Sequence, residues 1–346
     1  MHRMLLQLVT AISAASAAVS AAAEPVARSA SPADHLPSHI RQITYFGERV
    51  DFSHDGGRVS FVSKQFGDVM EYDIATGRLD CLSQHFHHHG FVRALYLPDG
   101  NLLLTGPDVP FDATDKRARA AARKSSKMFV LDRSRTKPPV PLGYECDEGP
   151  AVSRTRMRVA WTHGEQDCIS VGELRYVDGV PQLVDVRQVL DVSMFPEAAR
   201  PTIIETQNFV PPADELLTVT AYRQGLTPNT DVFLFGLQSG RLTNVTNSPE
   251  LYEECEGIFP DGRSTMVERN EHRGNDWPLA DGWRVWFDRS RKPERLTHFL
   301  EFPGYKATNY VVSDDGKRMA FQIGKAGDEA GVGYGLFLMD LPEERP

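Results

Sequence analysis

Apolar and polar residues alternate at period two through most of the chain, in short runs that are separated by Asp-Gly turns. The first clear unit reads VDFSHDGGRVSFVS (Val50–Ser63), and the last reads YVVSDDGKRMAFQI (Tyr310–Ile323). Alternation at period two predicts a strand with one buried face, and Asp-Gly supplies the positive φ of a tight hairpin turn. Each unit therefore predicts a pair of antiparallel strands.

The hairpin unit recurs six times along the chain, at a period of about 45–55 residues. The four units between the first and the last begin at Ala94, Ala151, Asn208 and Gly257. A second hairpin follows the first, as in VMEYDIATGRLDCLS (Val69–Ser83), so each unit contributes four strands. Four-stranded units at this period predict an all-β, six-bladed β-propeller, in which each blade is stabilised by stacking on its neighbours.

The ring is expected to close through the N-terminal segment. The last unit ends with GYGLFLMDLP (Gly333–Pro342), which supplies only a third strand. We expect HIRQITYF (His39–Phe46) to supply the fourth, because pairing the first and last segments removes an open sheet edge. Residues 40–346 then form one propeller domain. Residues 24–39, rich in Ala, Ser, Pro and His, are expected to be a disordered lead-in.

Residues 1–23 have the features of a cleaved signal peptide. A short basic start is followed by an apolar run of small residues that ends in Ala21, Ala22 and Ala23. A membrane anchor is the alternative, but a run dominated by Ala and Ser is a weak membrane span. The sequence therefore predicts a periplasmic or secreted protein with no stable membrane insertion after signal cleavage.

The paired signatures FSHDGGRVSFVS and EYDIATGRLDCLS resemble the repeats of the TolB-like six-bladed propellers. The resemblance covers essentially the whole chain after residue 23, and it implies the fold more strongly than a function. The sequence shows no counterpart of the α/β domain that precedes the TolB propeller, which favours a role different from that of TolB. Oligogalacturonate lyases use a similar single propeller and bind a divalent metal through His and Gln, but their ligand motif is not matched here.

Aligned on their turns, the units place a ring of polar residues at the start of each first strand, the strand that faces the channel of a propeller. Four of the six units have Glu at this position, and neighbouring positions add arginines and amides. The candidate ligand-binding residues are Glu48, Arg49, Arg93, Glu148, Glu205, Gln207, Glu254, Glu256 and Asn309. Clustered carboxylates raise one another's pKa and arginines lower it, which is the basis of general acid–base chemistry. A polar, water-filled channel without a function is the alternative interpretation.

Two further segments bear on the same face. The segment QHFHHHGFVR (Gln84–Arg93) contains His87 and His89, which project to the same side of an extended chain and form a candidate site for a divalent metal ion. A solvated polar loop is the alternative. Blade 2 also carries an insertion (residues 107–127) that predicts a short basic helix. This helix either covers the channel mouth, meets an anionic partner or is a solvated surface helix.

Charge and motifs exclude several functions. The net charge of −9 argues against nucleic-acid binding, which needs a basic face. The elbow motif of serine hydrolases, zinc-protease motifs and dinucleotide fingerprints are absent. The four cysteines lack zinc-site spacing and leave three disulfide pairings open: Cys81, Cys146, Cys168 and Cys255.

Two functions remain for an exported propeller of this kind. The first is the binding of a polar small molecule or oligosaccharide in the central channel, with lyase or hydrolase activity. The ring of glutamates and the arginines beside it motivate this hypothesis. The alternative is a non-enzymatic periplasmic scaffold that binds an envelope protein. TolB-like propellers bind partner peptides in or near the channel, and that resemblance motivates the scaffold.

Overall fold

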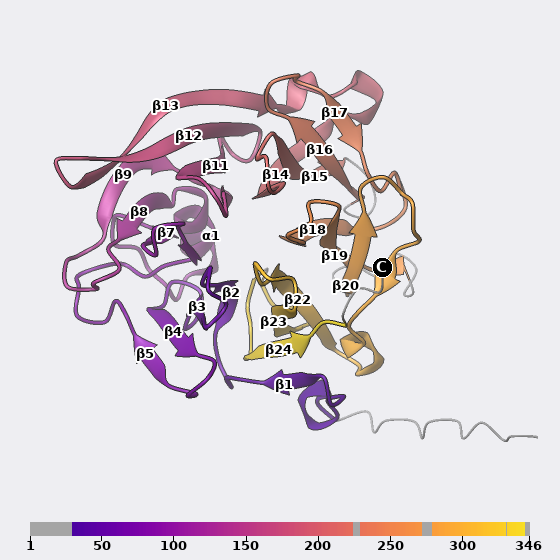
Figure 1. The fold of residues 1–346 in the computed structure, drawn as a ribbon, viewed down its shortest axis with the longest axis horizontal. Coiled ribbons are helices and arrows are strands. Elements are labelled where there is room, and N and C mark those ends of the chain that lie inside the picture. Colours follow the sequence, from indigo (N-terminus) through magenta and orange to yellow (C-terminus); the bar gives the residue numbers. More distant parts are fainter. Residues whose placement is uncertain (1–29, 224–228, 272–278, 330, 343–346) are drawn as a thin grey trace, which may run out of the picture.

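The computed structural model describes residues 30–223, 229–271, 279–329 and 331–342. These residues form six four-stranded antiparallel sheets, arranged around a central channel as the blades of a propeller (Figure 1). The predicted all-β, six-bladed fold is therefore confirmed. The predicted signal peptide, residues 1–23, lies outside the described residues.

In blades 1 to 5 the strands lie side by side in chain order, with the first strand nearest the channel, and in blade 6 the outermost strand comes from the N-terminal segment (Figure 1). The strands of blades 1 to 3 are β2 (Glu48–Phe52), β3 (Arg58–Val62), β4 (Val69–Asp73), β5 (Leu79–Cys81), β6 (Arg93–Tyr96), β7 (Leu102–Gly106), β8 (Lys127–Leu131), β9 (Val140–Glu145), β10 (Glu148–Val152), β11 (Arg158–His163), β12 (Cys168–Val177) and β13 (Val180–Asp191). Those of blades 4 to 6 are β14 (Pro201–Phe209), β15 (Leu216–Arg223), β16 (Thr230–Gly236), β17 (Leu242–Asn244), β18 (Glu253–Ile258), β19 (Ser264–Arg269), β20 (Asp281–Trp286), β21 (Glu294–Arg295), β22 (Tyr305–Val312), β23 (Arg318–Lys325) and β24 (Leu336–Asp340).

Helical structure is limited to short segments between the strands. Helix α1 (Lys116–Lys124) lies between β7 and β8 of blade 2. The 3-10 helices are η1 (Pro32–Asp34), η2 (Val192–Met194), η3 (Glu197–Ala199) and η5 (Phe299–Glu301). Among the described residues, no helix is long and apolar enough to cross a membrane.

The ring closes in blade 6, as the sequence predicts. Strand β1 (Ile40–Gln42) pairs antiparallel with β24, with Ile40 opposite Met339 and Gln42 opposite Phe337. The residues just before β1 are also ordered, which corrects the predicted disorder for residues 30–39. The Ser31 side chain caps η1, and Leu36 packs against the apolar cluster of blade 6. This packing fixes a segment whose composition alone is typical of a loose lead-in.

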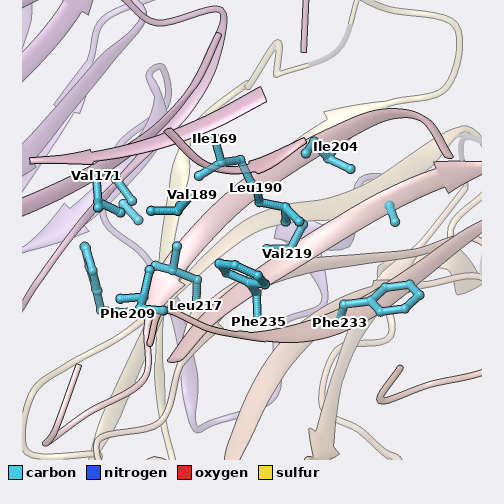
Figure 2. Packing of buried hydrophobic residues seen from close by; sticks show 14 of the residues in the cluster. Ile169, Val171, Val189, Leu190, Ile204, Phe209, Leu217, Val219, Phe233 and Phe235 are labelled. Atoms are coloured by element: carbon cyan, nitrogen blue, oxygen red, sulfur yellow. The ribbon is translucent and has the colours of Figure 1, made fainter. Parts of the chain in front are cut away.

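The hydrophobic core consists of layers between neighbouring blades. Figure 2 shows one layer, in which Val171 and Leu190 of blade 3 lie close to Leu217, Val219 and Phe235 of blade 4. Strands that lie inside a blade have neighbours on both faces, so the period-two pattern gives way to continuous burial in β7, where every residue is buried. A single blade leaves these faces exposed to water, and therefore stacking in a ring stabilises all six.

The Asp-Gly turns lie where neighbouring blades approach each other closely. At Gly262 φ is 66°, and a Cβ atom there would lie 2.0 Å from the carbonyl oxygen of Pro211 in blade 4. Only glycine satisfies both conditions, since it favours the left-handed region and has no side chain. Gly262 thus serves blade packing as well as the turn.

The four cysteines are free thiols in the structure, and none of the three pairings that the sequence leaves open is formed. Cys146 and Cys255 are buried, and Cys81 and Cys168 are half-buried. Burial raises the pKa of the Cys255 thiol to about 12, which keeps it protonated and unreactive at neutral pH.

Candidate functional site

The predicted ring of glutamates occupies equivalent places in the blades. Each ring residue lies in an inner strand, opposite a residue of the second strand. The opposed pairs are Glu48 and Val62, Glu148 and Thr162, Glu205 and Thr220, Glu254 and Glu268, and Thr308 and Gln322. In each of these inner strands the pairing register shifts shortly after this position, so a β-bulge bends the strand at the channel mouth. The alignment made from the turns is therefore correct in these blades.

These residues surround a cavity of about 620 Å³ at the channel mouth. Six of the nine predicted ligand-binding residues line it: Arg49, Arg93, Glu148, Glu205, Glu254 and Asn309. Gln207 and Glu256 instead line a smaller cavity of about 70 Å³ further along the channel, which shares Arg93 and Asn309 with the first. Glu48 is not among the residues that line either cavity.

Glu48 turns toward the last blade, although it shares the ring position of the other glutamates. It is 1% exposed, and its Oε2 atom accepts a hydrogen bond of 2.8 Å from the backbone N–H of Gly333. Burial raises the pKa of Glu48 to about 7. Glu48 therefore belongs to the wall behind the cavity.

On one side of the cavity, three arginines converge on one carboxylate. The guanidiniums of Arg49 and Arg93 each lie 3.1 Å from Oε1 of Glu148, and Arg123 pairs with its Oε2 atom. Burial alone raises the pKa of Glu148, but Arg123, Arg49 and Arg93 together hold it well below its usual range. We call Arg49, Arg93, Arg123 and Glu148 the cationic side of the cavity.

On the opposite side, three carboxyl groups face one another. One oxygen from each of Glu254, Glu256 and Glu268 lies within 4.8 Å of the others. Asn309 holds two of them, because its backbone N–H donates to Glu268 (2.9 Å) and its side-chain amide donates to Glu256 (3.3 Å). Burial, together with the neighbouring glutamates, raises the pKa of Glu268 to about 7 and that of Glu256 well above its usual value. The group must hold protons or a cation to avoid like-charge repulsion.

Glu205 extends this acidic group along the wall of blade 4. It accepts hydrogen bonds from the side-chain amide of Gln166 (2.6 Å) and from the hydroxyl of Tyr222 (3.2 Å). Burial and the charge of Glu254 raise the pKa of Glu205 well above its usual value. We call Glu205, Glu254, Glu256 and Glu268 the acidic side of the cavity. Carboxyl oxygens are ligands for hard cations such as Ca²⁺, so the acidic side contains the residues that could hold a metal ion.

Helix α1 contributes to the wall of this cavity and therefore is not the solvated surface helix considered as one alternative. Arg123 reaches from its last turn to Glu148. One turn earlier, Arg119 pairs with Glu329, with Nε 3.2 Å from Oε2. Glu329 belongs to the glycine-rich loop of blade 6, so this pair connects blade 2 with blade 6 across the mouth. The helix thus partly covers the cavity.

The far part of the channel is narrower and is crossed by one side chain. Arg154 of blade 3 lies 3.4 Å from Asp51 of blade 1 and 2.9 Å from Asp314 of blade 6. These ion pairs connect three blades around the small cavity. The larger cavity, which could accommodate a ligand, therefore lies at the channel mouth, under α1.

The histidine pair lies apart from both cavities. The rings of His87 and His89 are 5.2 Å apart, edge to face, so the two side chains do lie together as the extended segment predicts. His88 instead places Nε2 3.1 Å from Oδ1 of Asp68. Among the described residues, the group of three or more potential metal ligands that the structure brings together is Glu254, Glu256 and Glu268, which includes neither histidine. The metal role of His87 and His89 stays a prediction.

Several residues that the sequence did not single out as site residues line the cavity, among them Arg123, Glu268, Tyr222 and Lys306. Glu268 had a usable signal, because it lies seven residues after the turn residue Asp261, as Gln322 does after Asp315. In a hairpin this spacing places both at the mouth. Arg123 belongs to the basic helix that the sequence predicts, but the alignment of the repeats could not assign it to the ring, since an inserted helix has no counterpart in the other blades.

No protein-family model and no curated protein matches the chain. Solved structures of similar shape include an oligogalacturonate lyase in complex with manganese, with a TM-score of 0.52 and 14% identity over 86% of this chain and 78% of that one. A gluconolactonase from Xanthomonas campestris has a TM-score of 0.53 and 11% identity over 88% and 89% of the two chains. TolB from Acinetobacter baumannii, a TolB propeller, has a TM-score of 0.41 and 13% identity over 84% and 67%. At such identities these likenesses show the propeller fold alone.

Proposed function

We propose that the cavity at the channel mouth binds a saccharide and acts on it by acid–base lyase or hydrolase chemistry. The observation that carries this proposal is one cavity lined both by Glu148, whose pKa three arginines lower, and by Glu205 and Glu268, whose pKa values burial raises. Titratable groups whose environments push their pKa values apart are the usual components of acid–base sites.

The two sides offer different chemistry to a ligand. Glu268, whose burial raises its pKa to about 7, exchanges a proton near neutral pH and suits the role of general base. Burial raises the pKa of Glu205, which lines the same cavity, well above its usual value, and this direction suits the role of general acid. Sugar hydroxyls both donate and accept hydrogen bonds, so they match a wall of carboxyls, guanidiniums and tyrosine hydroxyls. The oligogalacturonate lyase and the gluconolactonase of similar shape are named for sugar-derived compounds.

Binding is tested by thermal unfolding of the protein with neutral and acidic oligosaccharides, with and without Mn²⁺ or Ca²⁺. A ligand that binds only the folded state raises the melting temperature. At a hundredfold excess of ligand over Kd, the free energy of unfolding increases by about 2.7 kcal/mol. We expect a saccharide to produce this rise and the Glu256→Gln, Glu268→Gln double variant to lose it. Glu250→Gln, at an exposed position that lines neither cavity, is the matched control.

Absence of a rise with every saccharide, in the presence and absence of metal, would overturn the binding proposal. That result would favour the alternative function, a periplasmic scaffold. The scaffold predicts a protein partner that crosslinks to the face around α1. Binding without turnover would retain the ligand site and remove the catalytic part of the proposal.

We also propose that residues 1–23 direct export and are removed. The basic start, the apolar run and the terminal alanines support this reading. Mass spectrometry of protein expressed from the full-length gene is expected to show a chain that begins at residue 24 in the extracytoplasmic fraction. An intact N-terminus in the cytoplasmic fraction would overturn it.

A further inference from the structure

The cationic side carries more positive charge than its own carboxylate neutralises. Three guanidiniums meet the single carboxylate of Glu148, which leaves an excess of two positive charges in a partly enclosed site. Burial and the neighbouring Arg93 lower the pKa of Arg49 to about 10, which still leaves it charged at neutral pH. Lys116 and Lys124 of α1 line the same cavity and increase the positive potential. Such an excess attracts anions.

Two of the three guanidiniums also have an N–H group that makes no hydrogen bond to the described residues. The buried Nε atoms of Arg49 and Arg93 have no hydrogen-bond partner among the described residues. Arg49 is 2% exposed, so bulk water does not satisfy it. A buried donor without a partner is costly, and a cluster of such donors beside a cavity is best explained by a ligand that accepts from them.

We propose that Arg49, Arg93 and Arg123 bind one oxyanion group of the ligand, a carboxylate, sulfate or phosphate, beside Glu148. This inference rests on the proposed function and narrows it to a saccharide that carries a negative group. Guanidinium groups are planar forks that match the oxygens of such groups in two parallel hydrogen bonds. In the structure, the carboxylate of Glu148 pairs with all three guanidinium groups.

Among the three arginines, Arg123 is the best one to mutate in a test of the oxyanion site, because it comes from α1. Arg49 and Arg93 belong to the inner strands of blades 1 and 2, whereas Arg123 reaches the site from the helix that partly covers the mouth. Binding of the oxyanion therefore draws α1 onto the cavity. Glu148 keeps two arginine partners when Arg123 is removed, so the Arg123→Met variant is expected to fold.

The experiment measures melting temperature against increasing sodium phosphate, sodium sulfate and sodium glucuronate, with sodium chloride at matched ionic strength as the reference and glucose as the neutral sugar. We expect at least one oxyanion to stabilise the wild-type protein more than chloride does, with an apparent affinity about tenfold weaker in Arg123→Met. Arg117→Met, at an exposed position of the same helix, is the matched control and is expected to respond as the wild type does. Arg123→Lys keeps the positive charge but lacks the planar guanidinium group. Its apparent affinity is expected to lie between those of Arg123→Met and the wild type.

Equal responses of Arg123→Met and the wild type, or no oxyanion response above chloride, would overturn the inference. A response to phosphate or sulfate without any response to a saccharide would support the oxyanion site and count against the proposed function. Equal stabilisation by glucose and glucuronate would support saccharide binding and overturn the oxyanion site. Stronger stabilisation by glucuronate than by phosphate or sulfate identifies the negative group as a carboxylate.

Discussion

The cationic side and the acidic side of the cavity contain glutamates from equivalent positions of the repeat whose pKa values are shifted in opposite directions. Glu148, at the start of β10, stays ionised because three guanidiniums from blades 1 and 2 surround it. Glu205, in the middle of β14, is surrounded by hydroxyl, amide and other carboxyl groups, and burial raises its pKa. The position in the repeat thus decides where a carboxyl group points, and the neighbouring blades decide its charge.

The largest expected effect is the loss of the carboxylate on the cationic side. Glu148→Gln leaves three guanidiniums close together without a counter-charge, and removing one partner of a buried ion pair costs about 3–5 kcal/mol. Chemical denaturation is expected to show a fall in the free energy of unfolding of this order at pH 7. Glu145→Gln, three residues away in an exposed pair with Lys127, is the control and should cost less than about 1 kcal/mol. Equal stability of the two variants would contradict this prediction, because it would show that the three guanidiniums do not need the charge of Glu148.

The same substitution on the acidic side is expected to have the opposite sign. Glu268→Gln keeps an oxygen to accept from Asn309 and removes a carboxyl group whose pKa burial raises to about 7. At pH 8 the wild-type protein must ionise this buried group beside Glu254, whereas Gln stays neutral. We expect Glu268→Gln to raise the free energy of unfolding at pH 8 by about 1–3 kcal/mol, since each tenfold change in a dissociation constant corresponds to about 1.4 kcal/mol. A destabilised variant at pH 8 would contradict this view of the acidic side.

The pH dependence of wild-type stability separates the two sides without any mutation. Burial raises the pKa of Glu48 and of Glu268 to about 7 in the folded state, so these groups bind protons that the unfolded chain has released. Their contribution to stability is complete below the usual glutamate pKa, about 4.3, and is lost as the pH rises through about 7. Glu148 has a lowered pKa, so its contribution is present above the usual value and is lost only in strong acid.

Unfolding free energies measured from pH 5 to pH 8 are therefore expected to decline, with a smaller slope in Glu48→Gln and Glu268→Gln. A flat profile in the wild-type protein would show that the acidic side is compensated, for example by a bound cation. Repeating the series with a chelator distinguishes these two explanations.

The smallest expected effect concerns the pair that connects α1 to blade 6. Arg119 and Glu329 are partly exposed, so Glu329→Gln should change the free energy of unfolding by less than about 1 kcal/mol. Local opening of α1 should nevertheless become easier, because few other contacts hold the helix over the mouth. Limited trypsin digestion is expected to cleave within residues 116–124 severalfold faster than in the wild-type protein. Unchanged cleavage would mean that the Arg123–Glu148 pair alone holds α1.

The sequence alone determined the propeller and most of its internal order. Alternation at period two and the Asp-Gly turns are local properties, so they predicted six blades, their inner strands and the equivalent places of Glu148, Glu205 and Glu254. Closure by the segment around Ile40 followed from the missing fourth strand of the last unit. These predictions succeeded because hairpin geometry is encoded within a few residues.

Only the tertiary structure decided which of these residues form the cavity and what charge they carry. Glu48 shares the ring position but turns to Gly333, and Arg123 joins the site from an insertion that no other blade contains. Burial and the charges of groups 25 or more residues away in the sequence set the pKa of Glu148 and of Glu205. Desolvation and Coulomb energy depend on distances in space, and therefore no pattern along the chain could supply them.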